Sequence, residues 1–304
     1  IRDSHDTYPM DVDGENTGIN CLYYGALNSA AWMARNILGD QVQADEWDQL
    51  AKDVHSSIQN YLWSDKDRAF KDGFESSRIT QQTQVYALKY GLVAEDKKPG
   101  VVSYVKSQGR SCEQSFSYWL LFTLFSEGEG QWALDYIRSY WGEQMKRKDF
   151  NGAWHEMWDT WGTTSHSWCS GPTALLPEKV LGVEPLKPGW KQFSIKPCLF
   201  DLEWAEAVIP SVAGDISVKL RRELQGGTEI GIQLCAVVPE HTRAKIFVPI
   251  QASEPYVIYA NDKKIWEDGA AVGTHKKISY SSVKDNFVVF EFQPGSFEIR
   301  SLRN

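Results

Sequence analysis

The chain has 304 residues, of which 42% are hydrophobic and 24% charged, a composition typical of folded globular proteins rather than disordered or fibrous ones. This length allows two domains that each have a core. A formal net charge of −8, without any block of lysine or arginine, disfavours nucleic acid as a partner. No apolar run approaches the roughly 18 to 20 residues that cross a bilayer, so no membrane partner is expected.

The first part of the chain, to about residue 182, has apolar residues at helical spacing, interrupted by short turn signals. Residues 17–38 show the pattern most clearly and stop before Gly39, a residue type that commonly follows a helix. Helices joined by short turns pack as antiparallel hairpins, which form either a superhelix or a closed toroid. Because no solenoid repeat is visible, part of an (α/α) six-hairpin toroid is predicted for residues 1–182. The other helices are expected at residues 44–62, 80–90, 100–106, 113–125, 131–145 and 168–181.

The number of predicted helices is too small to close such a ring. About seven helices are expected, whereas six hairpins need two helices each. We therefore expect the chain to be a C-terminal portion of a longer parent protein, whose N-terminal part completes the toroid.

After Gly182 the pattern changes to short segments that alternate apolar and polar residues, separated by Gly, Pro, Asp and Asn. This spacing predicts an antiparallel β-sandwich over residues 183–304. The strands are expected at residues 191–195, 215–220, 229–237, 243–248, 276–280 and 286–292.

The cysteines indicate neither a metal site nor a disulfide framework. They are odd in number, widely spaced and without a CxxC pair, so free or buried thiols are expected. They leave both a secreted or periplasmic and a cytoplasmic location open. No metal and no cofactor is predicted. The cysteines are Cys21, Cys112, Cys169, Cys198 and Cys235.

Residues 151–172, NGAWHEMWDTWGTTSHSWCSGP, combine aromatic, acidic and histidine side chains in a stretch whose glycines and threonines favour a loop. A glycosidase needs a carboxylate and flat apolar surfaces against which a sugar ring can lie. Glu156 among Trp154, Trp158 and Trp161 meets both needs, so Glu156 is the candidate catalytic residue and the tryptophans are candidates for substrate binding. On spacing alone, ordinary core packing of the tryptophans with a locally paired Glu156 is an equal alternative.

His166 lies ten residues after Glu156, before the last predicted helix. It is a candidate for binding a sugar hydroxyl or Glu156, although a single histidine before a helix is more often structural. His155 and Glu156 also match the opening of the HExxH zinc motif. Asp159 occupies the place of the second histidine, and the surrounding glycines disfavour the helix that this motif requires.

Two further polar clusters are candidate sites. The acidic residues Asp11, Asp13 and Glu15 lack the spacing of an EF-hand loop, and a solvated helix entrance or the rim of a site is expected there. A second cluster, Gln81, Gln82 and Gln84, could bind sugar hydroxyls. On a helix such glutamines are more often exposed polar residues, and that is the expectation.

Four segments of the chain together resemble the α-L-rhamnosidases, family 78-like glycoside hydrolases, and the resemblance covers about residues 1–220. It implies an inverting enzyme built on a six-hairpin (α/α) toroid, in which Glu156 is the general base and His166 lines the sugar subsite. Trp168 and the Gly171–Pro172 pair then follow in register. The segments are NTGINCLYYGALNSAAWMARNILGD, SFSYWLLFTLFSEG, GAWHEMWD and SHSWCSGPTALLPEKVLGVEPLKPGWKQFSIKP.

The chain departs from the family in lacking the acidic, arginine-containing motif that supplies the general acid. The resemblance therefore implies hydrolysis of terminal α-L-rhamnosyl residues by the intact parent, with a rhamnose-containing oligosaccharide or glycoside as substrate. A non-catalytic carbohydrate-binding or scaffold module, or a different (α/α) toroid glycosidase, is the alternative.

Overall fold

The computed structural model describes residues 10–11, 13–158, 163–164, 166–250, 255–267, 269–273 and 275–303. The chain divides into two compact units, residues Ile1–Pro172 and Thr173–Asn304. The sequence places the boundary ten residues later, where helices give way to strands. A domain boundary at residue 182 stays a prediction.

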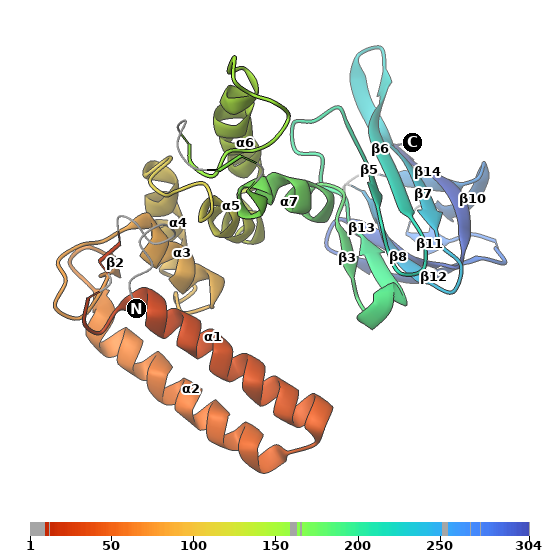
Figure 1. The fold of residues 1–304 in the computed structure, drawn as a ribbon. Coiled ribbons are helices and arrows are strands. Elements are labelled where there is room, and N and C mark those ends of the chain that lie inside the picture. Colours follow the sequence, from red (N-terminus) through yellow and green to blue (C-terminus); the bar gives the residue numbers. More distant parts are fainter. Residues whose placement is uncertain are drawn as a thin grey trace. The chain divides into compact units, whose positions relative to one another are not determined.

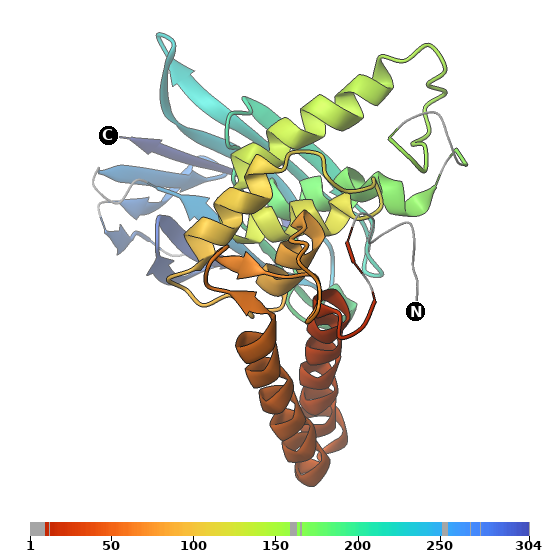
Figure 2. The same cartoon turned by 90° about the vertical axis from the view of Figure 1, so that its left-hand side faces the viewer.

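The first unit is helical, apart from a short hairpin of β1 (Trp63–Ser64) and β2 (Ala69–Phe70). Figures 1 and 2 both show α1 and α2 side by side as a long antiparallel hairpin. A π-helical turn, Ala34–Leu38, continues α1. The helices are α1 (Thr17–Met33), α2 (Gln41–Leu62), α3 (Gln81–Lys89), α4 (Lys98–Ser107), α5 (Ser117–Ser126) and α6 (Gly130–Met145).

These helices form two layers. In one layer α1 contacts α3, and α3 contacts α5. In the other, α2, α4 and α6 each pack on the helix that precedes them. All residues of α3 from Gln81 to Leu88 are buried, as expected for a helix covered from several sides. The helical part of the fold prediction is thereby confirmed.

The start and end of α1 follow local capping chemistry. Asn16 is almost fully buried, and its side-chain oxygen accepts a hydrogen bond of 2.8 Å from the backbone N–H of Ile19. At the other end, Gly39 adopts the left-handed conformation with φ 70° and stops the helical turn. The predicted end of this helix at Leu38 is therefore correct.

The expectation that the glutamines of α3 are exposed is wrong. Gln81 donates hydrogen bonds of 2.9 Å to the carbonyl oxygens of Val105 and Gly109. Gln84 pairs with both backbone groups of Phe70, at 2.9 and 2.7 Å. The amides serve as buried connectors from α3 to α4, to the residues after it and to β2, because buried peptide groups need hydrogen-bond partners.

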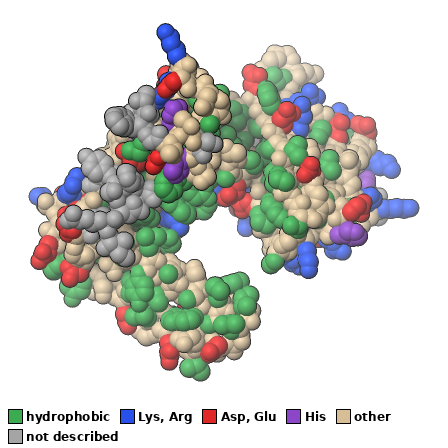
Figure 3. All heavy atoms as spheres, viewed as in Figure 1, with side chains coloured by type: hydrophobic (Ala, Val, Ile, Leu, Met, Phe, Trp, Pro, Cys, Tyr) green, Lys and Arg blue, Asp and Glu red, His purple; other side chains and the backbone are tan. Residues whose placement is uncertain are grey.

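One face of the α1–α2 hairpin is apolar and exposed, and Figure 3 shows hydrophobic side chains gathered along this hairpin. The exposed large side chains of α1 and of the turn after it are Ile19, Leu22, Tyr23, Trp32, Met33, Ile37 and Leu38. We call these residues the α1 apolar face. Patches of this kind on a folded protein mark surfaces that another structure covers.

The second unit begins within α7 (Gly171–Lys179) and continues as a β-sandwich. Among its described residues, strands form a seven-stranded sheet of order β11-β10-β9-β14-β7-β6-β5 and a five-stranded sheet of order β12-β13-β8-β4-β3. The strands are β3 (Val183–Pro185), β4 (Gln192–Ile195), β5 (Trp204–Ile209), β6 (Ile216–Gln225), β7 (Thr228–Val238), β8 (Arg243–Pro249), β9 (Tyr256–Ala260), β10 (Lys263–Glu267), β11 (Ala270–Ala271), β12 (Ile278–Lys284), β13 (Phe287–Phe292) and β14 (Gly295–Arg303).

The core of the sandwich contains alternate residues of both sheets. Phe193 and Phe290 from the five-stranded sheet are buried in one cluster with Val218, Leu234 and Ile299 from the seven-stranded sheet. Pairing is antiparallel in both sheets except between β4 and β8, which run parallel. A sandwich after the helical part is thus confirmed. No described helix is long and apolar enough to span a membrane.

Candidate active site

The loop between α6 and α7 carries the candidate residues, and its own backbone hydrogen bonds close it. The N–H of Glu156 donates to the carbonyl oxygen of Thr163 at 2.9 Å, and the N–H of His166 donates to that of Trp154 at 3.3 Å. An antiparallel bridge also joins His155 to Thr164. The two halves of the loop therefore lie side by side, which brings Glu156 next to His166 although ten residues separate them.

Glu156, Thr163 and His166 form a hydrogen-bonded cluster, which we call the Glu156 cluster. Oε2 of Glu156 accepts hydrogen bonds from the backbone N–H of Thr163 at 2.9 Å and from its hydroxyl at 3.1 Å. The same hydroxyl lies 2.5 Å from Nδ1 of His166, which is 3.5 Å from the carboxylate. The side chains of His166 and Glu156 are 26% and 22% exposed, so solvent reaches both. A carboxylate fixed in this way can accept a proton from a water molecule.

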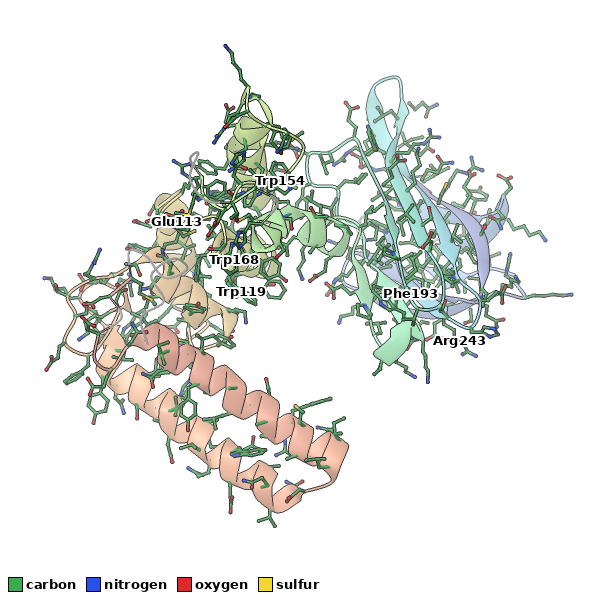
Figure 4. All side chains as sticks on the ribbon, in the orientation of Figure 1. Glu113, Trp119, Trp154, Trp168, Phe193 and Arg243 are labelled. Carbon is green, nitrogen blue, oxygen red and sulfur yellow. The ribbon has the colours of Figure 1, made fainter. Side chains whose placement is uncertain are left out.

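An exposed aromatic ring lies against this cluster. The ring of Trp168 stacks on His166 with centroids 4.3 Å apart and planes inclined by 23°, and Trp168 is 46% exposed. Figure 4 labels Trp168 and Trp154 in the part of the helical unit that contains this loop. Sequence reasoning did not single out Trp168 as a site residue, and the usable signal was its position two residues after His166.

The predicted tryptophans differ in their surroundings. Trp154 packs against Phe150 at 5.4 Å between ring centroids. The indole N–H of Trp158 donates to the carbonyl oxygen of Cys112 at 2.8 Å, and its ring lies 4.8 Å from that of Trp141. These contacts are those of a packing residue, and a role of Trp158 in sugar binding stays a prediction. Trp161 lies outside the described residues.

Buried helix side chains anchor the loop from below. The amide of Gln144 on α6 donates to the carbonyl oxygen of Met157 at 3.3 Å, and the indole N–H of Trp141 donates to that of Cys169 at 2.8 Å. The thiol of Cys169 donates in turn to the carbonyl oxygen of Glu156 at 3.1 Å. Both sides of the Glu156 cluster are thus held by α6.

The packing beneath the loop is strongly desolvated. Burial raises the pKa of the Cys112 thiol to about 12, against weaker opposing effects of hydrogen bonds from Ser117 and Tyr136. Burial likewise raises the pKa of Tyr136 well above its ordinary value. These groups therefore stay neutral and do not take part in proton transfer near neutral pH.

The zinc alternative gains no support from the described residues. His155 is buried, and neither of its ring nitrogens has a hydrogen-bond partner there. Among the described residues, no group of three or more His, Cys, Asp or Glu is arranged to hold a metal ion. Asp159, at the position of the second zinc histidine, lies outside them.

Comparison with known proteins points to one family. Residues 182–258 match the family described as bacterial alpha-L-rhamnosidase C-terminal domain. No curated protein sequence matches the chain significantly.

Three solved structures of similar fold are rhamnosidases. The alpha-L-rhamnosidase from Dictyoglumus thermophilum is 18% identical, with a TM-score of 0.73 over 93% of this chain and 31% of that one. The GH78 family rhamnosidase of Bacillus sp. GL1 is 24% identical, with a TM-score of 0.68 over 79% and 27%. The Streptomyces avermitilis alpha-L-rhamnosidase, solved in complex with L-rhamnose, is 18% identical, with a TM-score of 0.70 over 92% and 26%.

This chain thus spans less than a third of the length of these three proteins. At such low sequence identity the structural matches establish a shared fold. The sequence match to the family covers residues of the second unit only. The resemblance drawn from the sequence is therefore confirmed: the chain has the fold of a C-terminal portion of an α-L-rhamnosidase, and residues 182–258 match the C-terminal domain of that family.

Proposed function

We propose that the chain is the C-terminal portion of an inverting α-L-rhamnosidase in which Glu156 is the general base. The observation that carries this proposal is the Glu156 cluster beside the exposed ring of Trp168. In this arrangement a hydrogen-bonded carboxylate that solvent can reach lies near a flat apolar surface. Sugar hydrolysis requires this combination.

In the proposed reaction Glu156 takes a proton from a water molecule as that water attacks C1 of the rhamnosyl residue. The Thr163 backbone and hydroxyl hold one carboxylate oxygen in place, and His166 is positioned to contact a sugar hydroxyl or the carboxylate. A general acid protonates the departing oxygen. In inverting enzymes that acid lies roughly 6.5–9.5 Å from the base, which leaves room for the water. We place the acid in the parent, outside this chain.

The six-hairpin toroid is part of the proposal. The contacts of α1 with α3 and of α3 with α5, with α2, α4 and α6 packed outside them, fit a section of such a ring. The α1 apolar face is an uncovered side of the inner layer. An N-terminal part of the parent that adds further hairpins would cover it.

The proposal is tested by assaying the parent with 4-nitrophenyl α-L-rhamnoside, α-L-fucoside and β-D-glucoside. Selective hydrolysis of the rhamnoside, with the β-anomer of rhamnose appearing first in proton NMR, is expected. Preference for another glycoside identifies a different toroid glycosidase. Binding of rhamnose without turnover of any of the three glycosides identifies a non-catalytic carbohydrate-binding module.

A further inference from the structure

We propose that the outer face of the seven-stranded sheet carries a second carbohydrate-binding surface, which has Trp204 at one end and is suited to a neutral oligosaccharide. This surface lies in the second unit and shares no residue with the Glu156 cluster. The proposal holds whether or not the first unit cleaves sugar.

A row of side chains crosses this sheet. The pairing register sets Trp204 of β5 opposite Arg221 of β6, and Arg221 opposite Gln233 of β7. Gln233 is opposite Arg300 of β14, which is opposite Tyr259 of β9. Directly paired residues project to the same side of a sheet, so these five side chains share one face. They have an aromatic ring at each end and hydrogen-bonding groups between.

The row is long enough for an oligosaccharide rather than one sugar unit. Four inter-strand steps separate Trp204 from Tyr259, a distance of about 19 Å. At the Tyr259 end, the guanidinium of Arg300 lies 5.8 Å from the ring centroid and donates to Asp262 at 2.7 Å. In the middle, the Gln233 amide donates to Glu298 at 2.7 Å. The polar groups are therefore held in place before any ligand binds.

The Trp204 end of the row is hollowed. A cavity of about 380 Å³ there is lined by Trp204 with Glu206, Lys219, Arg221 and Leu224 among its walls. Trp204 is 58% exposed, so most of the indole is available to a ligand. The sandwich core does not need this ring, because the alternate residues Ala205 and Ala207 of the same strand pack on the core.

The charges of this hollow favour a neutral, hydroxyl-rich ligand. Glu206 and Lys219 of the lining form an ion pair of 2.9 Å. The other two basic residues of the lining, Arg221 and Arg222, lie beside Glu223 and Glu229, so each basic group has an acidic neighbour. The lining of the hollow therefore offers hydrogen-bond acceptors next to donors, which suit the adjacent hydroxyls of a sugar. Because the charges are paired, the hollow does not attract an ionic ligand. The indole face supplies the apolar surface against which a pyranose ring lies.

The test is affinity electrophoresis of the full chain in gels that contain arabinogalactan, xyloglucan or dextran, with dextran sulfate as a polyanion. Retardation by at least one neutral polysaccharide is expected. Trp204→Ala should weaken the apparent affinity about tenfold or more, because the buried contact area of a large side chain is lost. Tyr259→Ala should weaken it less.

Three controls make the result decisive. Trp32→Ala removes an equally exposed tryptophan, 57% against 58%, from the first unit and should leave retardation unchanged. Glu156→Gln should also leave it unchanged, which separates this surface from the proposed active site. In the parent, Trp204→Ala should keep wild-type turnover of an aryl rhamnoside. No retardation by any neutral polysaccharide, equal loss with Trp32→Ala, or retardation only by dextran sulfate would overturn the proposal.

Discussion

Thr163 is the residue that connects the two predicted site residues. Its backbone N–H and hydroxyl both donate to Glu156, and its hydroxyl also contacts His166. The backbone bond survives any substitution other than proline, whereas the hydroxyl bonds depend on the side chain. The geometry therefore assigns Thr163 a positioning role for the proposed base.

Thr163→Val in the parent should lower kcat about tenfold, because one of two hydrogen bonds to the base and the contact with His166 are lost. Thr163→Ser keeps the hydroxyl and should restore most of the rate. The measurement is kcat and KM for an aryl α-L-rhamnoside across pH 4–8. A loss of rate in Thr163→Ser with none in Thr163→Val would show that the methyl group, and not the hydroxyl, matters.

The cysteines should differ sharply in reactivity. Burial raises the pKa of Cys21 and of Cys112 to about 12, so at pH 8 both remain protonated, and the thiolate is the reactive form. Cys198 is exposed. Iodoacetamide at pH 8 should therefore modify Cys198 in the folded chain and leave Cys21 and Cys112 unmodified, as read by peptide mass spectrometry. The urea-unfolded chain is the control, in which all three should react at similar rates.

The sequence identified part of the candidate site. Glu156 and His166 were predicted because a carboxylate and an imidazole stood out in an aromatic loop. Thr163 and Trp168 were not, because their roles depend on the backbone bonds that fold the loop back on itself. For Trp158, spacing alone left sugar binding and core packing equal, because its contacts with Cys112 and Trp141 depend on the fold.

At the scale of elements, Gly182 forms the turn between the last helix and the sandwich. It has φ 68°, and a Cβ there would lie 2.0 Å from the carbonyl oxygen of Lys196. Gly189 has the same φ of 68° and nothing within 4 Å of a Cβ. Comparing an alanine substitution at each of the two glycines therefore distinguishes the cost of backbone strain from the cost of a steric clash.

Gly182→Ala should lower the free energy of unfolding by about 2–4 kcal/mol, the sum of left-handed strain and overpacking. Gly189→Ala should cost about 1–2 kcal/mol, from strain alone. Urea unfolding followed by far-ultraviolet circular dichroism measures both. Similar losses in the two variants would mean that the backbone at Gly182 shifts freely and no clash occurs.

Secondary structure was predicted well where the periodicity was local. The helices of the first unit and strands such as β7 and β8 lie close to the expected segments. Strands β5, β9 and β14 were missed. For β14 the reason is that it pairs with β7 and β9, far apart in sequence, and no local pattern records such pairing. The buried glutamines of α3 were misjudged for a similar reason: their partners belong to other elements, such as Val105 of α4 and Phe70 of β2.

At the scale of the whole molecule, the α1 apolar face should make the isolated chain self-associate. Ile37→Glu, at a residue that is 66% exposed, should weaken association about tenfold, because an apolar contact is replaced by a charge. Val212→Glu, at a residue 86% exposed in the second unit, is the matched control and should have no effect. Sedimentation equilibrium measures both. A wild-type chain that is strictly monomeric would contradict the expectation that another structure covers the α1 apolar face.

The central claim is that Glu156 is the general base of a glycoside hydrolase, and the rate of aryl α-L-rhamnoside hydrolysis by the parent carrying Glu156→Gln tests it most directly. An amide cannot accept the proton of the attacking water, so a loss of about 10²–10⁴-fold in kcat is predicted, with folding and rhamnose binding retained. The isolated chain should show no turnover, because the proposal places the general acid outside it. Turnover by the Glu156→Gln parent near the wild-type rate would contradict the account.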